Sequence, residues 1–194
     1  MRAPIRKPST FQISTQTLFP TLLHICDEFL TADQLKSLVG AAKDKVDVDD
    51  DALKAAVIDF GLGALAAECV DLERYDAVEL SEIWFNVLQI GEHHWDHTHA
   101  NHVLSGVIYL SDGCFTIFGD PRPAASVLAL NYKDPRPGNV RSFIHRGKKN
   151  SIVAFPSWLP HRVATTHVAR TTIAFNLMLR GPYGGAHSRE QINF

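Results

Sequence analysis

The sequence is short of cysteine, of charge of one sign and of long hydrophobic runs. Its 194 residues include three cysteines, 19 Lys and Arg and 21 Asp and Glu, and the formal net charge is −2. No apolar run approaches the length of about 20 residues that spans a bilayer. The basic residues are scattered, so they form no electrostatic footprint for nucleic acid or an anionic membrane. We therefore expect neither a membrane nor a nucleic acid as partner.

The three cysteines, Cys26, Cys69 and Cys114, are odd in number and widely spaced. This pattern fits neither a disulfide framework nor a zinc ribbon, so we interpret them as reduced thiols in the core. The first 14 residues, MRAPIRKPSTFQIS, carry basic residues without the apolar stretch of a signal peptide. Both features predict a cytoplasmic protein.

Length and composition favour one domain over residues 1–194. In residues 10–75 we expect two short strands around Pro20, followed by helices that support a sheet. Thr31 is a good N-cap, and Gln34 is its capping-box partner. A second helix is expected over 52–72, where Gly61 and Gly63 weaken the middle and are expected to split it in two. The acidic stretch 44–51 lies favourably before that helix.

Residues 80–180 are rich in β-branched and aromatic residues and lack helical patterns between the strands. Such a succession predicts an antiparallel sandwich or barrel, a mainly β fold with N-terminal helices. The Gly-rich residues 181–194 are expected to form a surface tail. The predicted strands are 82–90, 102–111, 114–120, 125–132, 142–147, 151–157 and 171–180.

Histidines gather in the stretch GEHHWDHTHANH, residues 91–102. Residues two apart on a strand share a face, so His97 and His99 can converge on one ion. The same alternation makes His94 and Asp96 a second candidate pair, and both pairs cannot serve one metal without distorting the strand. A third ligand is offered by His161, at the end of an apolar strand and a Pro-containing turn, with weaker competitors in His145 and His167.

Several motifs between residues 84 and 176 occur together. They are W-x-N at 84–86, GEHHWDHTH at 91–99, the strand VLSGVIYL, then FPSWLPH and ARTTIAFN. In this combination the sequence resembles the iron(II) and 2-oxoglutarate dependent oxygenases, more narrowly the small bacterial and phage-associated 2OG-Fe(II) oxygenases. The resemblance implies a double-stranded β-helix, a jelly roll of cupin-like type.

The resemblance also implies a metal register. In prolyl-hydroxylase-like relatives a Gly lies six residues before the first metal histidine, as Gly91 lies before His97 here, which favours His97 over His94. The implied Fe(II) ligands are His97, His99 and His161. The departure from the broader superfamily is that His99 occupies the usual carboxylate position. Asp96 remains an alternative, either as a hydrogen-bond acceptor behind the ligands or as a ligand in place of His99.

The resemblance assigns the cosubstrate 2-oxoglutarate to Arg170, nine residues after His161, and to Tyr109. An Arg at the start of a buried strand needs a partner, and a dicarboxylate supplies one. The alternatives are a salt bridge from Arg170 to an acidic residue and an ordinary core role for Tyr109.

The implied activity is that of a non-heme Fe(II) and 2-oxoglutarate dependent oxygenase of hydroxylase type, acting on a small-molecule or protein substrate. Two competing functions are a three-histidine dioxygenase of cupin type that uses no keto acid, and a metal-holding jelly roll without activity. Arg170 distinguishes these two functions from the implied oxygenase, because only the 2-oxoglutarate dependent oxygenase requires the Arg170 guanidinium to bind 2-oxoglutarate.

Overall fold

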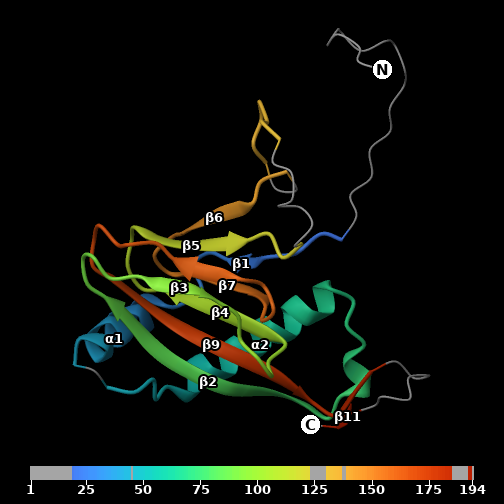
Figure 1. The fold of residues 1–194 in the computed structure, drawn as a ribbon. Coiled ribbons are helices and arrows are strands. Elements are labelled where there is room, and N and C mark those ends of the chain that lie inside the picture. The colour runs from blue at the N-terminus through green and yellow to red at the C-terminus, as the bar shows by residue number, and fades with distance from the viewer. Residues whose placement is uncertain (1–18, 45, 123–129, 137–138, 185–191, 194) are drawn as a thin grey trace, which may run out of the picture.

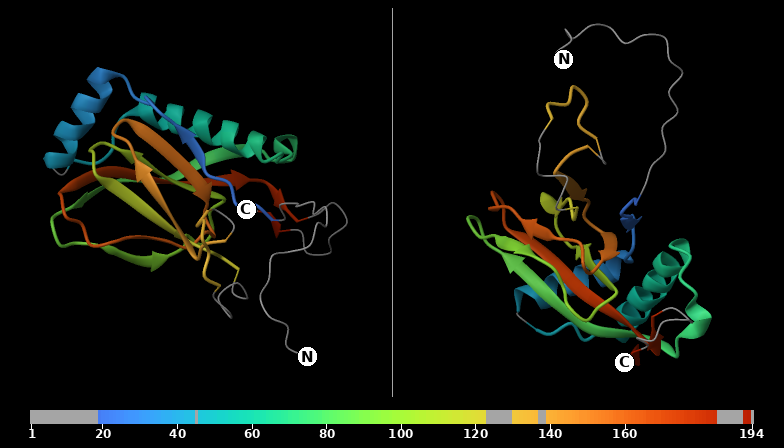
Figure 2. Two further views of the ribbon diagram at one scale, coloured as in Figure 1. Left: turned by 90° about the horizontal axis from the view of Figure 1, so that it is seen from above. Right: turned by 45° about the vertical axis from the view of Figure 1, so that its right-hand side comes forward.

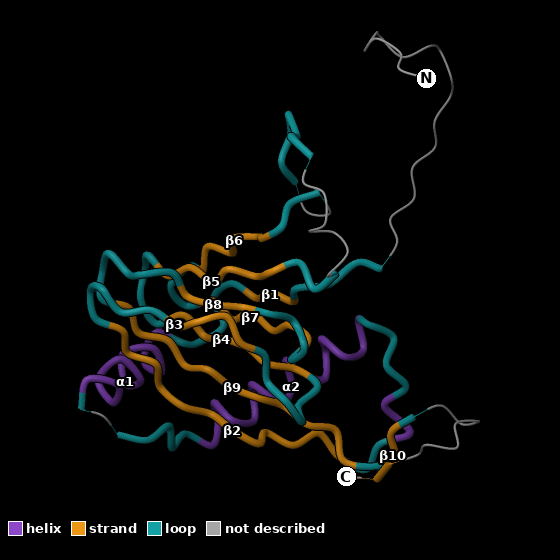
Figure 3. The backbone as a smooth tube through the Cα atoms, in the orientation of Figure 1, coloured by secondary structure: helices purple, strands orange, loops and turns teal. Residues whose placement is uncertain are grey.

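The computed structural model describes residues 19–44, 46–122, 130–136, 139–184 and 192–193. Two helices precede a series of antiparallel strands (Figures 1 and 3). In chain order the elements are β1 (His24–Cys26), α1 (Ala32–Lys43), α2 (Asp51–Ala67), a 3-10 turn (Leu72–Arg74), β2 (Ala77–Leu88), β3 (His94–His97), β4 (Leu104–Tyr109), β5 (Cys114–Gly119), β6 (Ser142–Gly147), β7 (Ser151–Pro156), β8 (His161–Val163), β9 (Arg170–Arg180), β10 (Pro182–Tyr183) and β11 (Ile192–Asn193).

Two antiparallel sheets form the body of the fold. The larger has the strand order β1-β7-β4-β9-β2, and the smaller has the order β3-β8-β5-β6. Consecutive strands repeatedly cross from one sheet to the other, as β4 and β5 or β7 and β8 do. This topology is the double-stranded β-helix, which confirms the expected fold class.

The central strands of the larger sheet, β7, β4 and β9, are buried on both faces, because helices cover one face and the smaller sheet covers the other (Figure 2). Along β4, Leu104 and Ile108 pack with α2 in the main apolar core, while Ser105 and Tyr109 point to the interior between the sheets. The alternation therefore separates an apolar face, which holds the fold together, from a face that carries polar side chains.

The helix starts follow their sequence signals. The Thr31 side chain accepts a hydrogen bond from the backbone of Gln34, and the Gln34 side chain accepts one from the backbone of Thr31, as the capping box predicts. Asp50 caps α2 by accepting from the backbone N–H of Leu53 at 2.9 Å. None of the described helices has the length and apolarity needed to cross a membrane.

The expectation of a split second helix is wrong, since α2 runs unbroken from Asp51 to Ala67. Gly61 is buried against the sheet, and a Cβ there would lie 2.1 Å from Cδ1 of Leu177. The missing side chain lets the helix approach β9 closely, and the packing gained offsets the poor helix propensity of glycine.

Other expectations differ at the edges of the fold. Of the predicted strand 125–132, residues 125–129 lie outside the described residues and 130–132 form no strand. Residues 10–18 also lie outside them, and β1 is the strand that follows. Within the predicted tail, β10 pairs with β11. All three cysteines are free, but Cys69 is exposed at the end of α2, so it is not a core thiol.

The two glycines of α2 provide a matched test of this packing. Gly63→Ala is expected to raise the free energy of unfolding by about 0.5–1 kcal/mol, because a Cβ there meets nothing within 4 Å. Gly61→Ala is expected to lower it by about 1 kcal/mol, since Leu177 is fully buried and has little room to move. Urea unfolding of both variants measures the difference, and equal stabilisation by the two would contradict the close approach.

Candidate metal centre and adjoining cavity

Three histidine side chains meet at one end of the space between the sheets. The ligand-capable atoms of His97, His99 and His161 all lie within 4.8 Å of one another. His97 is the last residue of β3 and His161 the first of β8, and the two are direct partners in the antiparallel pairing. His161 is buried, His99 is partly buried and His97 is exposed, so the cluster is open to solvent on one side.

His99 reaches the cluster by a different route from the one the sequence predicted. Simple strand alternation would place His97 and His99 on one face, but β3 ends at His97. His99 lies in the following turn, where its backbone N–H donates to the carbonyl oxygen of Ser157 at 2.9 Å. The pairing of β3 with β8 is also irregular between His94 and His97. The convergence is therefore made by the turn and by β8.

Two of the imidazoles are oriented by backbone carbonyls. His97 Nδ1 donates to the carbonyl oxygen of Trp95 at 2.8 Å, and His161 Nδ1 donates to that of Leu159 at 2.9 Å. A carbonyl can only accept, so in both rings Nδ1 carries the hydrogen. This leaves the free lone pair on Nε2. In metal sites, the tautomer of a ligating histidine is fixed in the same way, by a hydrogen bond from the ring nitrogen that does not bind the metal.

The third imidazole is held by a polar network on the inner face of β4 and β9. Nδ1 of His99 lies 3.2 Å from Nδ2 of Asn176, whose Oδ1 accepts from Ser105 Oγ at 2.7 Å. Nδ2 of Asn176 also donates to Glu82 at 2.6 Å. The same Nδ2 thus faces both Glu82 and Nδ1 of His99, and an amide nitrogen only donates, so Nδ1 of His99 is the acceptor in this arrangement. Metal ligation by Nε2 of His99 would require a hydrogen on Nδ1 and therefore a rearrangement of this network.

The competing ligand pair lies elsewhere. The carboxylate of Asp96 forms an ion pair with Arg162 at 3.2 Å on the surface of the smaller sheet, and it does not belong to the three-histidine cluster. His94 faces the adjoining cavity, and its pKa is lowered by burial and by the nearby His97 and Arg170. His145 lies beside Tyr109, with ring centroids 5.8 Å apart, and His167 is exposed.

Two imidazoles of the cluster, those of His99 and His161, resist protonation because their pKa values are lowered. Burial, aided by the neighbouring His97 and His99, lowers the pKa of His161 to about 4 from an ordinary value of 6.5. Burial, aided by the neighbouring His97 and His102, also lowers the pKa of His99. Neutral imidazoles are the form that binds a metal cation, so these two rings are ready to act as ligands near neutral pH.

A cavity of about 120 Å³ continues from the histidines into the space between the sheets. Arg170, which is only 4% exposed, lies in its wall. Its Nη1 donates to the carbonyl oxygen of Phe115 at 2.8 Å, whereas its buried Nε has no hydrogen-bond partner among the described residues. Among the described residues, Arg170 forms no salt bridge to an acidic side chain, which was the alternative to binding a dicarboxylate. A buried guanidinium with an unused donor has the charge and the hydrogen-bonding capacity to bind an anion in the cavity.

Tyr109 lies behind the cavity wall. Its side chain is fully buried, its hydroxyl is 2.8 Å from Oγ1 of Thr116, and burial raises its pKa to about 12. Thr116 itself lines the cavity, as do Trp84 and Asn86 of the W-x-N motif. Sequence reasoning missed Thr116, Ser105 and Glu82. The signal for Asn176 was available, since it is a polar residue within the apolar strand TTIAFNLML.

The chain was compared with known protein families and solved structures. Residues 82–176, about half of the chain, match the family model described as "Putative 2OG-Fe(II) oxygenase". That segment contains the motifs from W-x-N to FN and all three clustered histidines. No curated protein sequence matches the chain.

Similar solved structures include a prolyl-4-hydroxylase from Pseudomonas putida, with TM-score 0.58, 18% identity and coverage of 83% of this chain and 89% of that one. The viral collagen prolyl hydroxylase of Paramecium bursaria Chlorella virus-1 gives TM-score 0.55, 10% identity and coverage of 87% and 98%. HygX from Streptomyces hygroscopicus, with nickel and 2-oxoglutarate bound, gives TM-score 0.53, 12% identity and coverage of 81% of this chain and 82% of that one. At these identities the likeness shows the shared fold.

The low pKa of His161 makes the metal-free protein sensitive to acid. The unfolded chain takes up a proton near pH 6.5 and the folded chain only near pH 4, so folding stability is intact above 6.5 and falls as the pH drops through this window. The loss from this residue reaches about 3 kcal/mol. Urea unfolding between pH 7 and pH 4 is expected to show a shallower pH dependence for His161→Gln. Identical slopes would contradict a neutral, buried imidazole.

Proposed function

Because the chain belongs to the 2OG-Fe(II) oxygenase family, we propose that it is an oxygenase of hydroxylase type whose Fe(II) is held by His97, His99 and His161. One observation carries the residue assignment: three imidazoles within 4.8 Å of one another stand at the mouth of a cavity whose wall includes a buried arginine with an unused donor. The three-histidine set takes the place of two histidines and a carboxylate.

The donor set fits a first-row divalent metal. Imidazole nitrogen suits iron, and two of the rings already present Nε2 with its lone pair free. Three neutral ligands leave the metal with one more unit of positive charge than a set that includes a carboxylate, which favours an anionic co-ligand. When bound, Fe(II), with 2-oxoglutarate and dioxygen as co-reactants, would supply the oxidising chemistry: one oxygen atom would enter succinate as the keto acid loses carbon dioxide, and the other would enter the hydroxylated C–H bond.

Arg170 is proposed to bind the far carboxylate of 2-oxoglutarate. Its guanidinium forms part of the wall of the cavity that extends from the histidines, and its planar fork suits a carboxylate. Tyr109 is proposed to support the same carboxylate through Thr116, because its hydroxyl holds the Thr116 hydroxyl that reaches the cavity. Both residues then orient the cosubstrate rather than take part in bond breaking.

Asp96 is proposed to act outside the ligand set. Its pairing with Arg162 links β3 to β8 next to the two histidines that these strands carry. We further propose a small-molecule substrate and a location in the cytoplasm, where the exposed thiol of Cys69 stays reduced.

The ligand register is tested by the visible charge-transfer band that forms when Fe(II) and then 2-oxoglutarate are added anaerobically to metal-free protein. The band is expected in the wild type and in Asp96→Ala, and it is expected to be lost in His99→Ala, which removes one of three ligands. Titration spectra of the three proteins measure it. Loss of the band in Asp96→Ala alone would show that the aspartate, not His99, binds the metal.

The cosubstrate site is tested by Arg170→Met, with Arg180→Met as control on the far end of the same strand. Removing a charged hydrogen-bond donor from a buried site costs about 2 kcal/mol or more, so the apparent KM for 2-oxoglutarate is expected to rise about 30-fold or more, with partial recovery at high 2-oxoglutarate. The rate of succinate formation is measured for both variants over a range of 2-oxoglutarate concentrations.

Oxygen consumption that needs no 2-oxoglutarate and is unchanged in Arg170→Met would instead favour the cupin-type dioxygenase that uses no keto acid. Tight zinc occupancy without oxygen-dependent succinate formation would favour a metal-holding protein without activity.

A further inference from the structure

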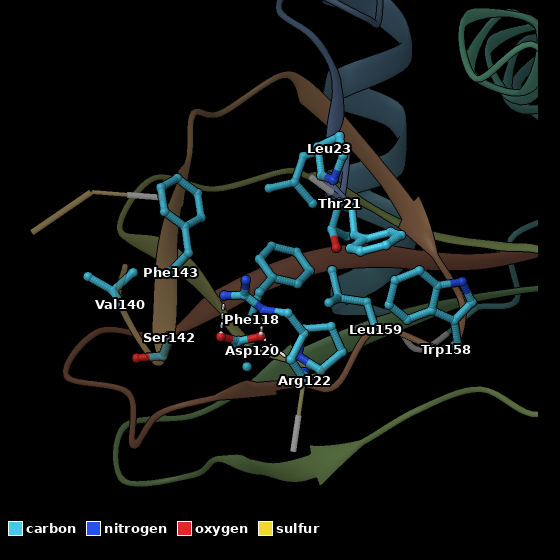
Figure 4. A pocket seen from close by; sticks show the side chains of 14 residues that line it. Thr21, Leu23, Phe118, Asp120, Arg122, Val140, Ser142, Phe143, Trp158 and Leu159 are labelled. Atoms are coloured by element: carbon cyan, nitrogen blue, oxygen red, sulfur yellow. Dashed lines mark hydrogen bonds and ion pairs between the residues drawn. The ribbon is translucent and has the colours of Figure 1, made fainter. Parts of the chain in front are cut away.

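Two of the three imidazoles are held in the form that can bind a metal, because backbone carbonyls fix the hydrogen on Nδ1 of His97 and of His161. The side chain of Leu159, whose carbonyl orients His161, lies with Phe118 beside a separate hollow of about 550 Å³ (Figure 4). Among the described residues, none lines both that hollow and the cavity beside the histidines. The orientation of His99 is set differently, by side chains of the larger sheet.

Asn176 stands at the centre of the network that holds His99. It lies on β9 between two other strands, and its direct partners are Ser105 on β4 and Glu82 on β2. Its Oδ1 accepts from Oγ of Ser105 at 2.7 Å, and that Oγ is also 2.8 Å from Oγ of Ser157. Asn176 and Ser157 are 0% exposed and Ser105 is 1% exposed. These buried groups therefore depend on one another for their hydrogen bonds.

The other end of the Asn176 amide faces Glu82 and His99. Its Nδ2 donates to the carboxylate of Glu82 at 2.6 Å and lies 3.2 Å from Nδ1 of His99. A carboxylate can only accept, so the amide atom beside Glu82 is the nitrogen, and its two hydrogens serve the two contacts. Nδ1 of His99 is then an acceptor, and a neutral imidazole carries its hydrogen on Nε2 in that case. In His99, therefore, Nε2 has no free lone pair for a metal.

A β-bulge aims Glu82 at this network. The register of β2 against β9 shifts between Leu80 and Glu82, so Ser81 is an extra residue on β2. The hydroxyl of Ser81 donates to the backbone carbonyl oxygen of Asn176 at 3.2 Å. If the pairing continued regularly from Leu80, Ser81 would stand opposite Asn176 and Glu82 would face the other side of the sheet. The bulge therefore makes the contact between Glu82 and Asn176 possible.

The amide of Asn176 can turn over within the same network. Its Oδ1 then accepts a hydrogen from Nδ1 of His99, which frees the lone pair on Nε2. Its Nδ2 then donates to Ser105, since a hydroxyl can act as donor or acceptor. Glu82 loses its partner, because two oxygens would face each other. Its side chain is 56% exposed, so it can turn toward water or toward Nε2 of His102, which lies 3.9 Å from its carboxylate.

We propose that Asn176 is a positioning residue that sets the tautomer of His99, and that Glu82 holds it in the arrangement in which Nε2 of His99 does not bind the metal. The metal recruits His99 by turning the amide and releasing Glu82. No proton is gained or lost, because one hydrogen moves from Nε2 to Nδ1 of the same ring. The proposal rests on the proposed function, in which His99 is the third ligand.

The tautomer is tested on the full chain by long-range ¹H–¹⁵N NMR spectra, which show which ring nitrogen carries the hydrogen. The signals of His99 are identified by their loss in His99→Ala. In the metal-free protein we expect the hydrogen on Nε2 of His99 but on Nδ1 of His161. After addition of Zn(II), a diamagnetic probe, we expect it on Nδ1 of His99. A hydrogen on Nδ1 of His99 before zinc is added, or on Nε2 in the zinc-bound protein, would overturn the inference.

The role of Glu82 is tested by the affinity for Co(II) alone in Glu82→Gln. A glutamine forms a neutral hydrogen bond with Asn176 in place of a charge-assisted one, which is about twice as strong, so Co(II) binding is expected to tighten about 5-fold. Loss of a nearby negative charge would on its own weaken binding. The titrations are therefore made in about 1 M salt, where the screening length is about 3 Å.

Glu79→Gln is the matched control, because Glu79 is a partly exposed acid on the same strand that pairs with Arg180. It is expected to leave the affinity for Co(II) unchanged. Unchanged or weaker binding in Glu82→Gln, or equal tightening in Glu79→Gln, would contradict a restraining role for Glu82.

The anaerobic chelate band separates failure of this inference from failure of the proposed function. If the band forms in the wild type while the tautomer of His99 stays the same with and without zinc, the role of Asn176 alone is overturned. If the wild type forms no band and binds neither zinc nor cobalt, the proposed function fails, and the recruitment of His99 fails with it.

Discussion

The site depends on the antiparallel pairing of two short strands, β3 and β8, because this pairing sets His97 directly opposite His161. These strands belong to the smaller sheet, whose position over the larger one is fixed by the apolar interior. The carbonyls of Trp95 and Leu159, each two residues before its histidine, then turn both rings so that Nε2 faces inward. The main chain thus performs much of the orientation that other metal sites assign to carboxylates.

Much of this arrangement was accessible from the sequence. The long apolar strands, the capping box at Thr31 and the motif combination from 84 to 176 predicted the fold class, and the motifs predicted which histidines would meet. The route taken by His99 was not accessible, because strand alternation says nothing about where β3 ends. Gly61 was misjudged for a related reason: propensity describes an isolated helix, whereas the helix in this fold gains from close contact with Leu177.

Two of the residues that sequence reasoning missed, Ser105 and Glu82, lie behind the one proposed ligand that departs from the superfamily pattern. His99 has no carboxylate equivalent beside it, yet Glu82 is connected to it through Asn176. The carboxylate of Glu82 therefore lies one side chain further from the proposed metal than a ligating carboxylate would. Glu82 also lies 3.9 Å from His102, and it is more than half exposed, so its charge is partly screened by water. The proposed metal keeps more of its own positive charge, while its surroundings still carry a compensating group.

The ring of Phe118 has a consequence for the rigidity of the metal centre. It packs edge-on against Phe155, with ring centroids 4.9 Å apart, and Phe155 packs edge-on against the imidazole of His161 at 4.7 Å. Apolar packing therefore holds this imidazole together with the carbonyl oxygen of Leu159. A metal would meet a ring that is already held in place, which lowers the entropic cost of binding it.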